Sequence, residues 1–343
     1  MSTIARTQDL QGALRRTASG GHLDRDDMRL ALGHIMDGRA SQAQIGAFLI
    51  SLAHNRETVD ELIGAARALR ERAISVRCVR RPLLDVCGTG GDRSGSFNIS
   101  TATAFVVAGA GIAVAKHGNR AISSGCGSAD VLEALGIDLD AASSRAENTL
   151  ALNNIAFIFA QLHHPAMRSV AAVRRELGVR TLFNLVGPLT NPADPTHQVV
   201  GVSDVRFAPL VAEALRELGR ERAAVICAAD GMDEASVSCA TRVVEWTGST
   251  MQEYDIAPEM AGLSRREAGG LVGGDARRNA EIIMRVLAGA PGPRRDVVVL
   301  NAALGLWIAG AALDLAAGAR LAERSIDSGA AAAALDVLME CSP

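Results

Sequence analysis

A chain of 343 residues, of which 48% are hydrophobic and 21% charged, is long enough for a large buried core and for two domains. Its formal net charge is −3 without a block of like charges, which excludes the strong electrostatic attraction typical of nucleic-acid and membrane-surface proteins. We therefore expect a globular protein that binds no nucleic acid and holds any anionic ligand through local groups.

Two features of the sequence bear on its cellular location. The longest apolar stretch, which starts at Val297, contains Asn301, so we expect a buried helix rather than a membrane span. The six cysteines form no CxxC pair and need no disulfide framework in a chain of this size, which indicates a reducing compartment. We expect a cytoplasmic protein without membrane contact.

The first part of the chain is predicted to be entirely helical. From Ala13 to about Ala73, apolar residues recur at spacings of three and four, and glycine-containing turns interrupt the pattern. Amphipathic helices that alternate with such turns are typical of a small helical domain.

Strand, loop and helix patterns alternate after Pro82. The apolar segment 83–87 precedes the segment GTGGDRSGSFNIS (88–100), which we call the glycine loop. Beyond the sheet strands, a hairpin is predicted around 244–248 and alanine-rich helices from Arg277 to the end. The alternation predicts an α/β fold with a mainly parallel central sheet. The further strands are predicted at 112–115, 155–160, 198–203 and 223–228.

The glycine loop has the composition of an anion-binding site. A strand end followed by a helix, here predicted from about Asn98 to Ala110, brings unpaired backbone N–H groups and the positive end of the helix dipole to one point. Glycines let the backbone approach a phosphate, and hydroxyl side chains add donors. The loop matches neither GxGxxG nor GxxxxGK[ST], and taken alone it leaves open a plain turn with a helix cap.

Two other predicted strand ends carry related polar groups. KHGN contains Lys116, the only lysine of the chain, and SSGCGSAD follows at 123–130. DGMDE (230–234), which we call the acidic loop, contains the adjacent carboxylates Asp233 and Glu234. Loops at the carboxyl ends of parallel strands converge on one crevice, where the lysine would meet phosphate and the carboxylates would hold Mg²⁺. Taken alone, an Asp-Glu pair is more often a solvated loop.

Six motifs occur together in the order and spacing of one enzyme family: GTGGD, NIST, KHGNR, GSADVLEALG, HHPAMRSVAAVRRELGVRTLFNLVGPLTNP and DGMDEAS. Over nearly its whole length the chain resembles the anthranilate phosphoribosyltransferases, which catalyse the second step of tryptophan biosynthesis. The resemblance implies a helical domain over 1–78, joined by helices from about 164–190. It also implies a large α/β domain over 79–343 of the nucleoside phosphorylase and phosphoribosyltransferase type.

The resemblance implies an activity and an assembly as well. The phosphoribosyl group of phosphoribosyl diphosphate is transferred to the amine of anthranilate, giving N-(5-phosphoribosyl)anthranilate and diphosphate. The reaction depends on Mg²⁺, and the enzyme is a homodimer formed through the helical domain.

Individual residues acquire expected roles from the same resemblance. Phosphoribosyl diphosphate would be bound by Gly88, Gly91, Asp92, Ser96, Asn98, Ile99, Ser100, Thr101, Lys116, Ser124 and Ser128. Anthranilate would be contacted by Gly88, His117, Asn119, His164 and Arg174. Two Mg²⁺ ions per site would be held by Ser100, Asp233 and Glu234.

Two expected roles also have a chemical rationale. The planar guanidinium of Arg174, on a helix predicted to open at His164, suits the anthranilate carboxylate, although without the resemblance a surface charge is an equal alternative. We expect His117 and His164 to pack or contact substrate rather than act as general bases, because an aniline amine needs little proton abstraction. The barrier lies mainly in breaking the bond between the ribose C1 and diphosphate, so we expect electrostatics and orientation without a covalent protein intermediate.

The sequence departs from the family pattern at a few positions. Gly125-Cys126-Gly127 stands where Lys-Ser-Gly is usual, which removes one cation from the phosphate neighbourhood. Cys227-Ala228 stands where His-Gly is common, and Ser96 replaces a common threonine while keeping the hydroxyl.

Other functions stay open, the first because of these departures and the second because of a similar fold. One alternative is a transferase of the same fold with another aromatic acceptor. A second is a pyrimidine nucleoside phosphorylase, which would need neither the Asp233–Glu234 metal site nor a carboxylate-binding Arg174. A nucleic-acid-binding scaffold is disfavoured because the chain has no basic stripe.

Overall fold

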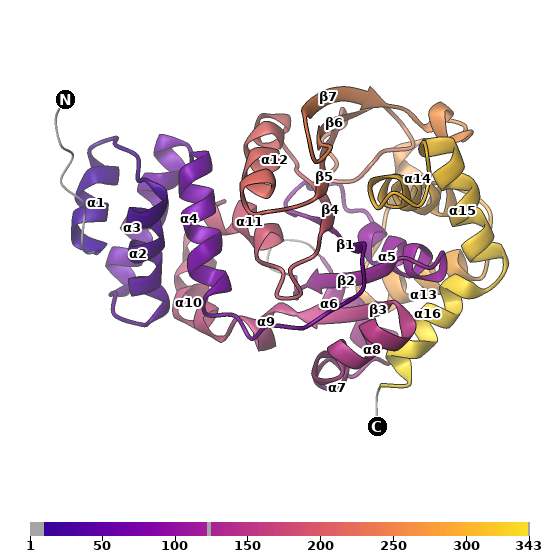
Figure 1. Ribbon diagram of the computed structural model, residues 1–343, viewed down its shortest axis with the longest axis horizontal. Helices are drawn as coiled ribbons and strands as arrows, with labels where there is room; N and C mark the ends of the chain where they lie inside the picture. The colour runs from indigo at the N-terminus through magenta and orange to yellow at the C-terminus, as the bar shows by residue number, and fades with distance from the viewer. Residues whose placement is uncertain (1–9, 122–124, 342–343) are drawn as a thin grey trace.

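The computed structural model describes residues 10–121 and 125–341. Residues 10–70 form helices that lie side by side at the end of the molecule opposite the C-terminal helices (Figure 1). They are α1 (Leu10–Ala18), α2 (Arg25–Met36), α3 (Gln42–Asn55) and α4 (Val59–Arg70). Capping boxes begin α3 and α4 and satisfy backbone N–H groups that the first helical turn leaves free.

One sheet organises the rest of the described chain. Its strands are β1 (Leu83–Gly88), β2 (Ala113–Gly118), β3 (Ile155–Phe159), β4 (His197–Gly201), β5 (Arg222–Ala228), β6 (Thr241–Trp246) and β7 (Met251–Ile256). Their order is β3-β2-β1-β4-β5-β6-β7; β1 to β5 pair in parallel, and β6 and β7 add an antiparallel hairpin. The strand order reverses between β1 and β4, and ligands of open α/β sheets bind at the carboxyl ends of strands beside such a reversal.

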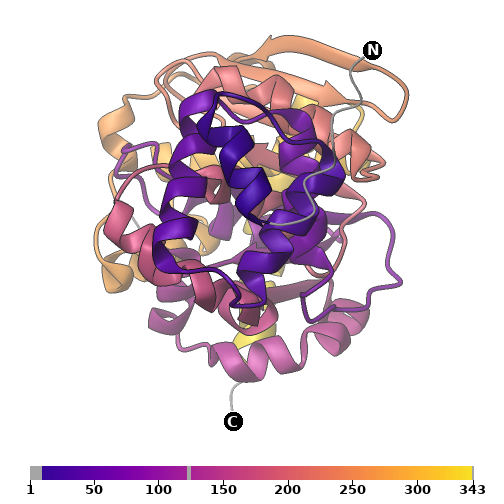
Figure 2. The ribbon, with the colours of Figure 1, turned by 90° about the vertical axis from the view of Figure 1, so that its left-hand side faces the viewer.

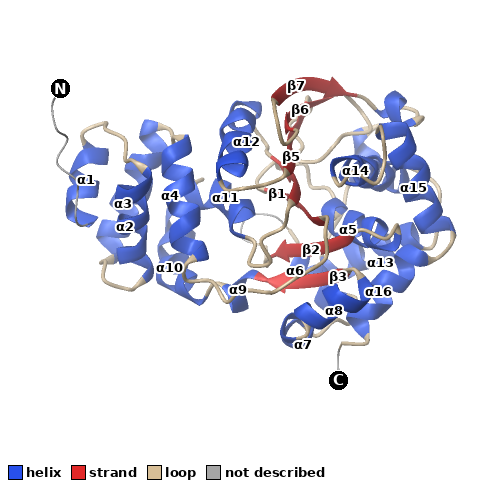
Figure 3. Ribbon diagram, in the orientation of Figure 1, coloured by secondary structure: helices blue, strands red, loops and turns tan. Residues whose placement is uncertain are grey.

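Helices cover both faces of the sheet (Figure 3). On one face, α5 (Ile99–Gly109) packs against β1 and β2 and against α14 (Pro293–Ile308) and α16 (Ala330–Met339). On the other face, α12 (Ala208–Glu217) packs against β5 and β6. Alternate residues of β5 therefore enter two different buried clusters, as the strand period of two requires.

Two helices from the middle of the chain lie against the N-terminal helices. Helix α10 (Arg168–Leu177) packs against α2 and α3, and α11 (Leu182–Val186) packs against α3 and α4. Viewed from the helical end, the N-terminal helices lie in front of the α/β part (Figure 2). The remaining α-helices are α6 (Ser128–Ala134), α7 (Leu139–Ser144), α8 (Ala146–Asn153), α9 (Ala160–His163), α13 (Ala276–Leu287) and α15 (Leu315–Asp327).

The predicted fold class is confirmed: a helical N-terminal part precedes an α/β part with a mainly parallel sheet. One predicted boundary is wrong, because the helix expected to open at His164 begins at Arg168 after a 3-10 turn over Pro165–Met167. A proline disfavours helical geometry in the preceding residue, and His164 is not helical. The exact division of the chain at residues 78 and 79 stays a prediction.

The apolar stretch from Val297 is part of a buried helix, α14, as predicted. Among the described helices, none combines the length and the apolar character needed to cross a bilayer. The six cysteines all lie in the described ranges, and none of them forms a disulfide there.

Candidate active site

The glycine loop and the acidic loop meet beside the carboxyl ends of β1 and β5. Two hydrogen bonds join them: Gly90 N–H donates to Asp233 Oδ2 (2.7 Å), and Ser100 N–H donates to Glu234 Oε1 (3.0 Å). Each bond spans more than a hundred residues of sequence, and the two acceptors are adjacent carboxylates. The predicted convergence of these loops is therefore present in the structure.

Glycine is required where the two loops approach each other. A Cβ atom on Gly88 would lie 2.3 Å from Asp233 Oδ2, and a Cβ atom on Gly201 would lie 1.6 Å from the Asp233 carbonyl oxygen. Gly90 and Gly91 adopt φ values of 70° and 79°, which L-residues rarely adopt. Gly88 and Gly201 therefore allow the two loops to approach each other closely, and Gly90 and Gly91 allow the chain to turn.

Three carboxylates lie close together at this junction: Asp233 is buried, and Asp92 and Glu234 are half-buried. Burial, reinforced by the charge of Asp92, raises the pKa of Asp233 to about 7. Burial, reinforced by the charge of Asp233, raises the pKa of Glu234 to about 8. The half-buried Asp92 side chain also contributes to the raised pKa of Asp233 through a side-chain hydrogen bond. Such a group of carboxylates is stabilised by a cation.

The donor set fits magnesium better than a metal enclosed by protein ligands alone. Among the described residues, no cluster of three or more His, Cys, Asp or Glu side chains has the geometry to hold a metal. Mg²⁺ keeps several waters and combines one or two carboxylates with substrate phosphate oxygens. Asp233 and Glu234, with Ser100 beside Glu234, provide such a partial set.

Lys116 lies near the end of β2 and is only 5% exposed. Its positive charge acts on the carboxylates of Asp85 and Glu234, yet no described carboxylate oxygen pairs with it within 4.0 Å. Asp85 is fully buried and accepts hydrogen bonds from Asn191 Nδ2 (2.9 Å) and His117 N–H (3.3 Å). The ammonium is thus available for an anionic ligand.

The end of the glycine loop leads directly into α5. Asn98 is the N-cap residue, but its side chain makes no cap bond and instead donates to the Cys126 carbonyl oxygen (3.2 Å). Ser96 hydrogen-bonds with Ser94, and Thr101 Oγ1 is buried without a partner among the described residues. The Ile99 side chain lies in the core at 1% exposure and does not line the loop.

A second loop follows β2 and ends at α6. Ser128 begins α6, and its hydroxyl donates to the Asn119 carbonyl oxygen (3.3 Å). The Asn119 side chain accepts hydrogen bonds from Arg120 N–H (2.8 Å) and Gln161 Nε2 (3.2 Å). Ser124, also predicted to bind phosphoribosyl diphosphate, lies outside the described residues.

The residues predicted to contact anthranilate have few polar partners. The imidazole rings of His117 and His164 lie 5.2 Å apart between centroids, and Nε2 of each is buried without a partner among the described residues. Burial lowers the pKa of His117, and it lowers that of His164 to about 4, so both rings are neutral near pH 7. The Arg174 guanidinium lies 5.1 Å from the centre of the Phe183 ring and forms no ion pair with a described carboxylate.

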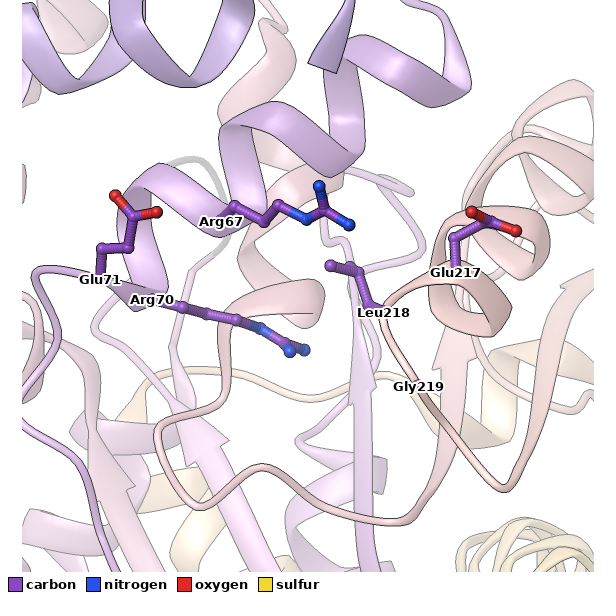
Figure 4. A pocket seen from close by; sticks show the side chains of 6 residues that line it. All are labelled: Arg67, Arg70, Glu71, Glu217, Leu218 and Gly219. Atoms are coloured by element: carbon purple, nitrogen blue, oxygen red, sulfur yellow. The ribbon is translucent and has the colours of Figure 1, made fainter. Parts of the chain in front are cut away.

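A separate hollow of about 390 Å³ lies between the end of α4 and the end of α12 (Figure 4). Its arginines project from α4 toward the residues that follow α12 (Figure 4). The lining residues are Arg67, Arg70, Glu71, Glu217, Leu218 and Gly219. None of them belongs to the glycine loop or the acidic loop.

Sequence reasoning assigned no role at the site to several buried polar residues near it. Asp85 is fully buried, and its carboxyl group interacts electrostatically with Lys116. The sequence feature that could have indicated it was a carboxylate inside the apolar strand LLDVC. Asn279 lies behind the glycine loop and donates to the Asn98 side chain. Asn301 binds both backbone groups of Ala235, the residue after the acidic loop. The two asparagines gave no signal beyond a polar residue in an apolar helix pattern.

Two family models match the chain. The model described as the glycosyl transferase family a/b domain matches residues 80–332, and the helical bundle domain of the same family matches residues 11–73.

Similar curated proteins cover almost the whole chain. An anthranilate phosphoribosyltransferase from Syntrophobacter fumaroxidans is 48% identical over 330 residues, which are 96% of this chain and 98% of the relative. An anthranilate phosphoribosyltransferase from Anaeromyxobacter dehalogenans is 50% identical over 322 residues, covering 94% and 95%.

The similar solved structures are also of anthranilate phosphoribosyltransferases. Anthranilate phosphoribosyltransferase from Thermus thermophilus is similar with a TM-score of 0.91 and 42% identity, covering 96% of this chain and 98% of the other. The Saccharomyces cerevisiae enzyme in complex with PRPP and Mg is similar with a TM-score of 0.89 and 26% identity, covering 97% of each chain.

Proposed function

The chain belongs to the anthranilate phosphoribosyltransferase family, and we propose that it transfers the phosphoribosyl group of phosphoribosyl diphosphate to the amine of anthranilate. The observation that carries the proposal is the pair of hydrogen bonds from Gly90 to Asp233 and from Ser100 to Glu234, which join the glycine loop to two adjacent carboxylates. The high identity to relatives named for this activity supports it over the phosphorylase alternative. The enzyme would thereby act in tryptophan biosynthesis.

The glycine loop and Lys116 would bind phosphoribosyl diphosphate. Backbone N–H groups at the start of α5 and the unpaired ammonium of Lys116 supply positive charge for phosphate oxygens. The Thr101 hydroxyl, which has no described partner, adds a donor. The proposed set is Gly88, Gly91, Asp92, Ser96, Asn98, Ile99, Ser100, Thr101, Lys116, Ser124 and Ser128.

Magnesium would be held by Ser100, Asp233 and Glu234, with two ions per site. The raised pKa values of the two carboxyl groups support a cation there, because a nearby positive charge keeps both ionised at neutral pH. Bound at these oxygens, Mg²⁺ supplies the neutralisation of negative charge that builds on the diphosphate leaving group.

Arg174 would hold the carboxylate of anthranilate, with Gly88, His117, Asn119 and His164 around the ring. A guanidinium without a carboxylate partner can form a bidentate pair with a planar acid. The imidazoles, neutral at pH 7, offer nitrogen atoms and ring faces to the acceptor. The residues then orient the amine toward the ribose C1, and no side chain needs to form a covalent intermediate.

A homodimer through the helical domain and a cytoplasmic location remain part of the proposal and rest on the resemblance. Sedimentation of the purified chain tests the first point: the mass of a dimer supports it, and the mass of a monomer at micromolar concentration contradicts it.

Loss of anthranilate fluorescence tests the proposed reaction directly. The purified protein is mixed with anthranilate, phosphoribosyl diphosphate and Mg²⁺, and EDTA is added to a matched sample. Rapid loss that EDTA stops is the expected result. No loss, with binding of phosphoribosyl diphosphate retained, would mean that the Gly125 and Cys227 departures mark a different acceptor.

A further inference from the structure

Asn279 is a buried polar residue inside an otherwise apolar helix face. It is 2% exposed and lies one turn into α13, beside Ala280, Ile282 and Ile283. Asparagine is a poorer helix former than alanine, and its amide must find hydrogen-bond partners when it is buried. A buried polar residue that is unfavourable for its own helix is expected to have a role in the contacts that its side chain makes.

The amide of Asn279 joins two segments that are distant in sequence. Its Nδ2 donates to Asn98 Oδ1 (3.0 Å), and its Oδ1 accepts from Gly274 N–H (2.8 Å). Asn98 in turn donates to the Cys126 carbonyl oxygen (3.2 Å). Asn279 therefore fixes the orientation of the Asn98 amide, since one end of that amide receives a hydrogen bond and the other gives one.

The Cys126 side chain also contacts Asn279. Burial raises the pKa of the Cys126 thiol, and a hydrogen bond with the Asn279 side chain acts in the opposite direction. Asn279 thus contacts the loop after β2 as well as the N-cap of α5. Cys126 is one of the positions at which this sequence departs from the family pattern.

The backbone before α13 supports the glycine loop over several residues. Phe97 N–H donates to the Leu271 carbonyl oxygen (3.2 Å), and Gly273 N–H donates to the Gly95 carbonyl oxygen (2.9 Å). A Cβ atom on Gly273 would lie 2.6 Å from Asn279 Oδ1 and 2.8 Å from Phe97. The glycine loop, the segment 271–274 and Asn279 are therefore packed as one unit.

We propose that Asn279 is a positioning residue that acts through Asn98 to hold the glycine loop in its phosphate-binding conformation. It does not itself contact substrate. The inference rests on the proposed function, in which Asn98 and the glycine loop bind phosphoribosyl diphosphate. Its consequence is specific: loss of the Asn279 amide weakens binding of phosphoribosyl diphosphate and leaves the acceptor side of the site intact.

The test compares Asn279→Ala, Asn98→Ala and the double variant in the full-length enzyme. Asn279→Ala should raise the KM for phosphoribosyl diphosphate about tenfold, the effect of one buried hydrogen bond, and leave kcat and the KM for anthranilate within about threefold. In the double variant, the KM for phosphoribosyl diphosphate should be at most about twice that of the more impaired single variant, because both changes remove the same hydrogen bond between Asn279 and Asn98. Additive effects would contradict action through Asn98.

Ser325→Ala is the matched control. Ser325 is 3% exposed on α15 and donates to the Val106 carbonyl oxygen (2.8 Å), so its removal also deletes a buried hydrogen bond from the C-terminal helices. It should leave the KM for phosphoribosyl diphosphate within about twofold. If Asn279→Ala fails to fold, Asn279→Ser provides the same comparison, since serine is polar but too short to reach Asn98.

Hydrogen exchange separates this inference from the proposed function. The amides of Phe97 and Gly273 should exchange at least about tenfold faster in Asn279→Ala than in the wild-type enzyme or Ser325→Ala. Binding of inorganic diphosphate, measured by calorimetry, should weaken in parallel, and neither readout requires anthranilate. Unchanged exchange and unchanged diphosphate binding would overturn the role of Asn279, and so would an equal rise in both KM values.

Discussion

The two sides of the candidate site are built differently. On the phosphate side, formed by the glycine loop, Lys116 and the acidic loop, backbone N–H groups already bind Asp233 and Glu234 across the sheet. On the proposed acceptor side, which comprises His117, His164 and Arg174, the Nε2 atom of each imidazole has no hydrogen-bond partner and the guanidinium has no carboxylate partner among the described residues.

The difference indicates which interactions hold the residues of each side in place. The proposed phosphate side is held by hydrogen bonds within the protein, and the raised pKa values of its carboxyl groups make it sensitive to cations and pH. The proposed acceptor side is held largely by packing, and the Nε2 atoms of its two histidines have no hydrogen-bond partner among the described residues. Changes on the first side should therefore alter turnover and stability, whereas changes on the second should alter acceptor affinity.

The largest effect is expected from removing both carboxylates of the proposed metal site. Asp233→Asn with Glu234→Gln should lower kcat with Mg²⁺ by about a thousandfold, because transition-state charge on the leaving group is no longer neutralised. Circular dichroism should show an intact fold. Initial rates over a range of Mg²⁺ concentrations measure the effect.

A charge-matched control is available on the hairpin. Glu253→Gln with Asp255→Asn removes two exposed carboxylates that pair with Arg242 on the neighbouring strand and should leave turnover within about twofold. Turnover of the acidic-loop variant within tenfold of wild type would remove Asp233 and Glu234 from the mechanism.

A smaller and more selective effect is expected on the acceptor side. Arg174→Ala should raise the KM for anthranilate about thirtyfold, the loss of a charge-assisted pair, and change that for phosphoribosyl diphosphate by less than about threefold. Arg175→Ala is the control, because Arg175 is the exposed neighbour on the same helix. A similar rise in both KM values would show that Arg174 does not anchor the carboxylate.

The location of the site was predictable from sequence, because it follows from local patterns and one topological rule. Strand-loop-helix alternation predicted a parallel sheet, and polar loops after its strands had to converge at the carboxyl ends. The contact of Gly90 with Asp233 realises that prediction. The individual ligand roles came from the family resemblance, not from periodicity.

The supporting contacts were not predictable, because they join residues that are far apart in sequence. Asn98 and Asn279 are 181 residues apart, and neither hydrophobic spacing nor helix propensity encodes such a pairing. Asp85 depends likewise on Asn191, 106 residues away. Only the rule that buried polar groups need partners would have drawn attention to these positions, and burial itself was unknown.

The buried carboxyl groups also predict how stability depends on pH. Asp233 and Glu234 have raised pKa values in the folded state, so the folded chain holds protons that the unfolded chain has released. Stability is therefore lost as pH rises through the folded pKa values of about 7 and about 8. Without metal, raising the pH from about 6.5 to about 9 should lower the free energy of unfolding by about 3 kcal/mol and lower Tm by a few degrees.

Thermal unfolding at several pH values, in EDTA and in Mg²⁺, measures the slope of stability against pH. The pH range starts at about 6.5 so that the histidines contribute little. Their lowered pKa values make stability rise with pH only below that point. Mg²⁺ should flatten the slope, and so should the Asp233→Asn, Glu234→Gln variant. A slope that is the same in the wild-type enzyme and this variant would assign it to other groups.

The smallest effect is expected from the histidine pair. His164→Phe keeps a ring beside His117 and removes the unpartnered Nε2, so the KM for anthranilate should rise about threefold with kcat within about twofold. A general base would behave differently, because its loss lowers kcat by about a hundredfold or more. Since both imidazoles are neutral above about pH 6.5, the KM for anthranilate should also be constant from there to about pH 8.5. A hundredfold fall in kcat would make His164 part of the chemistry and the acceptor side more than a packed surface.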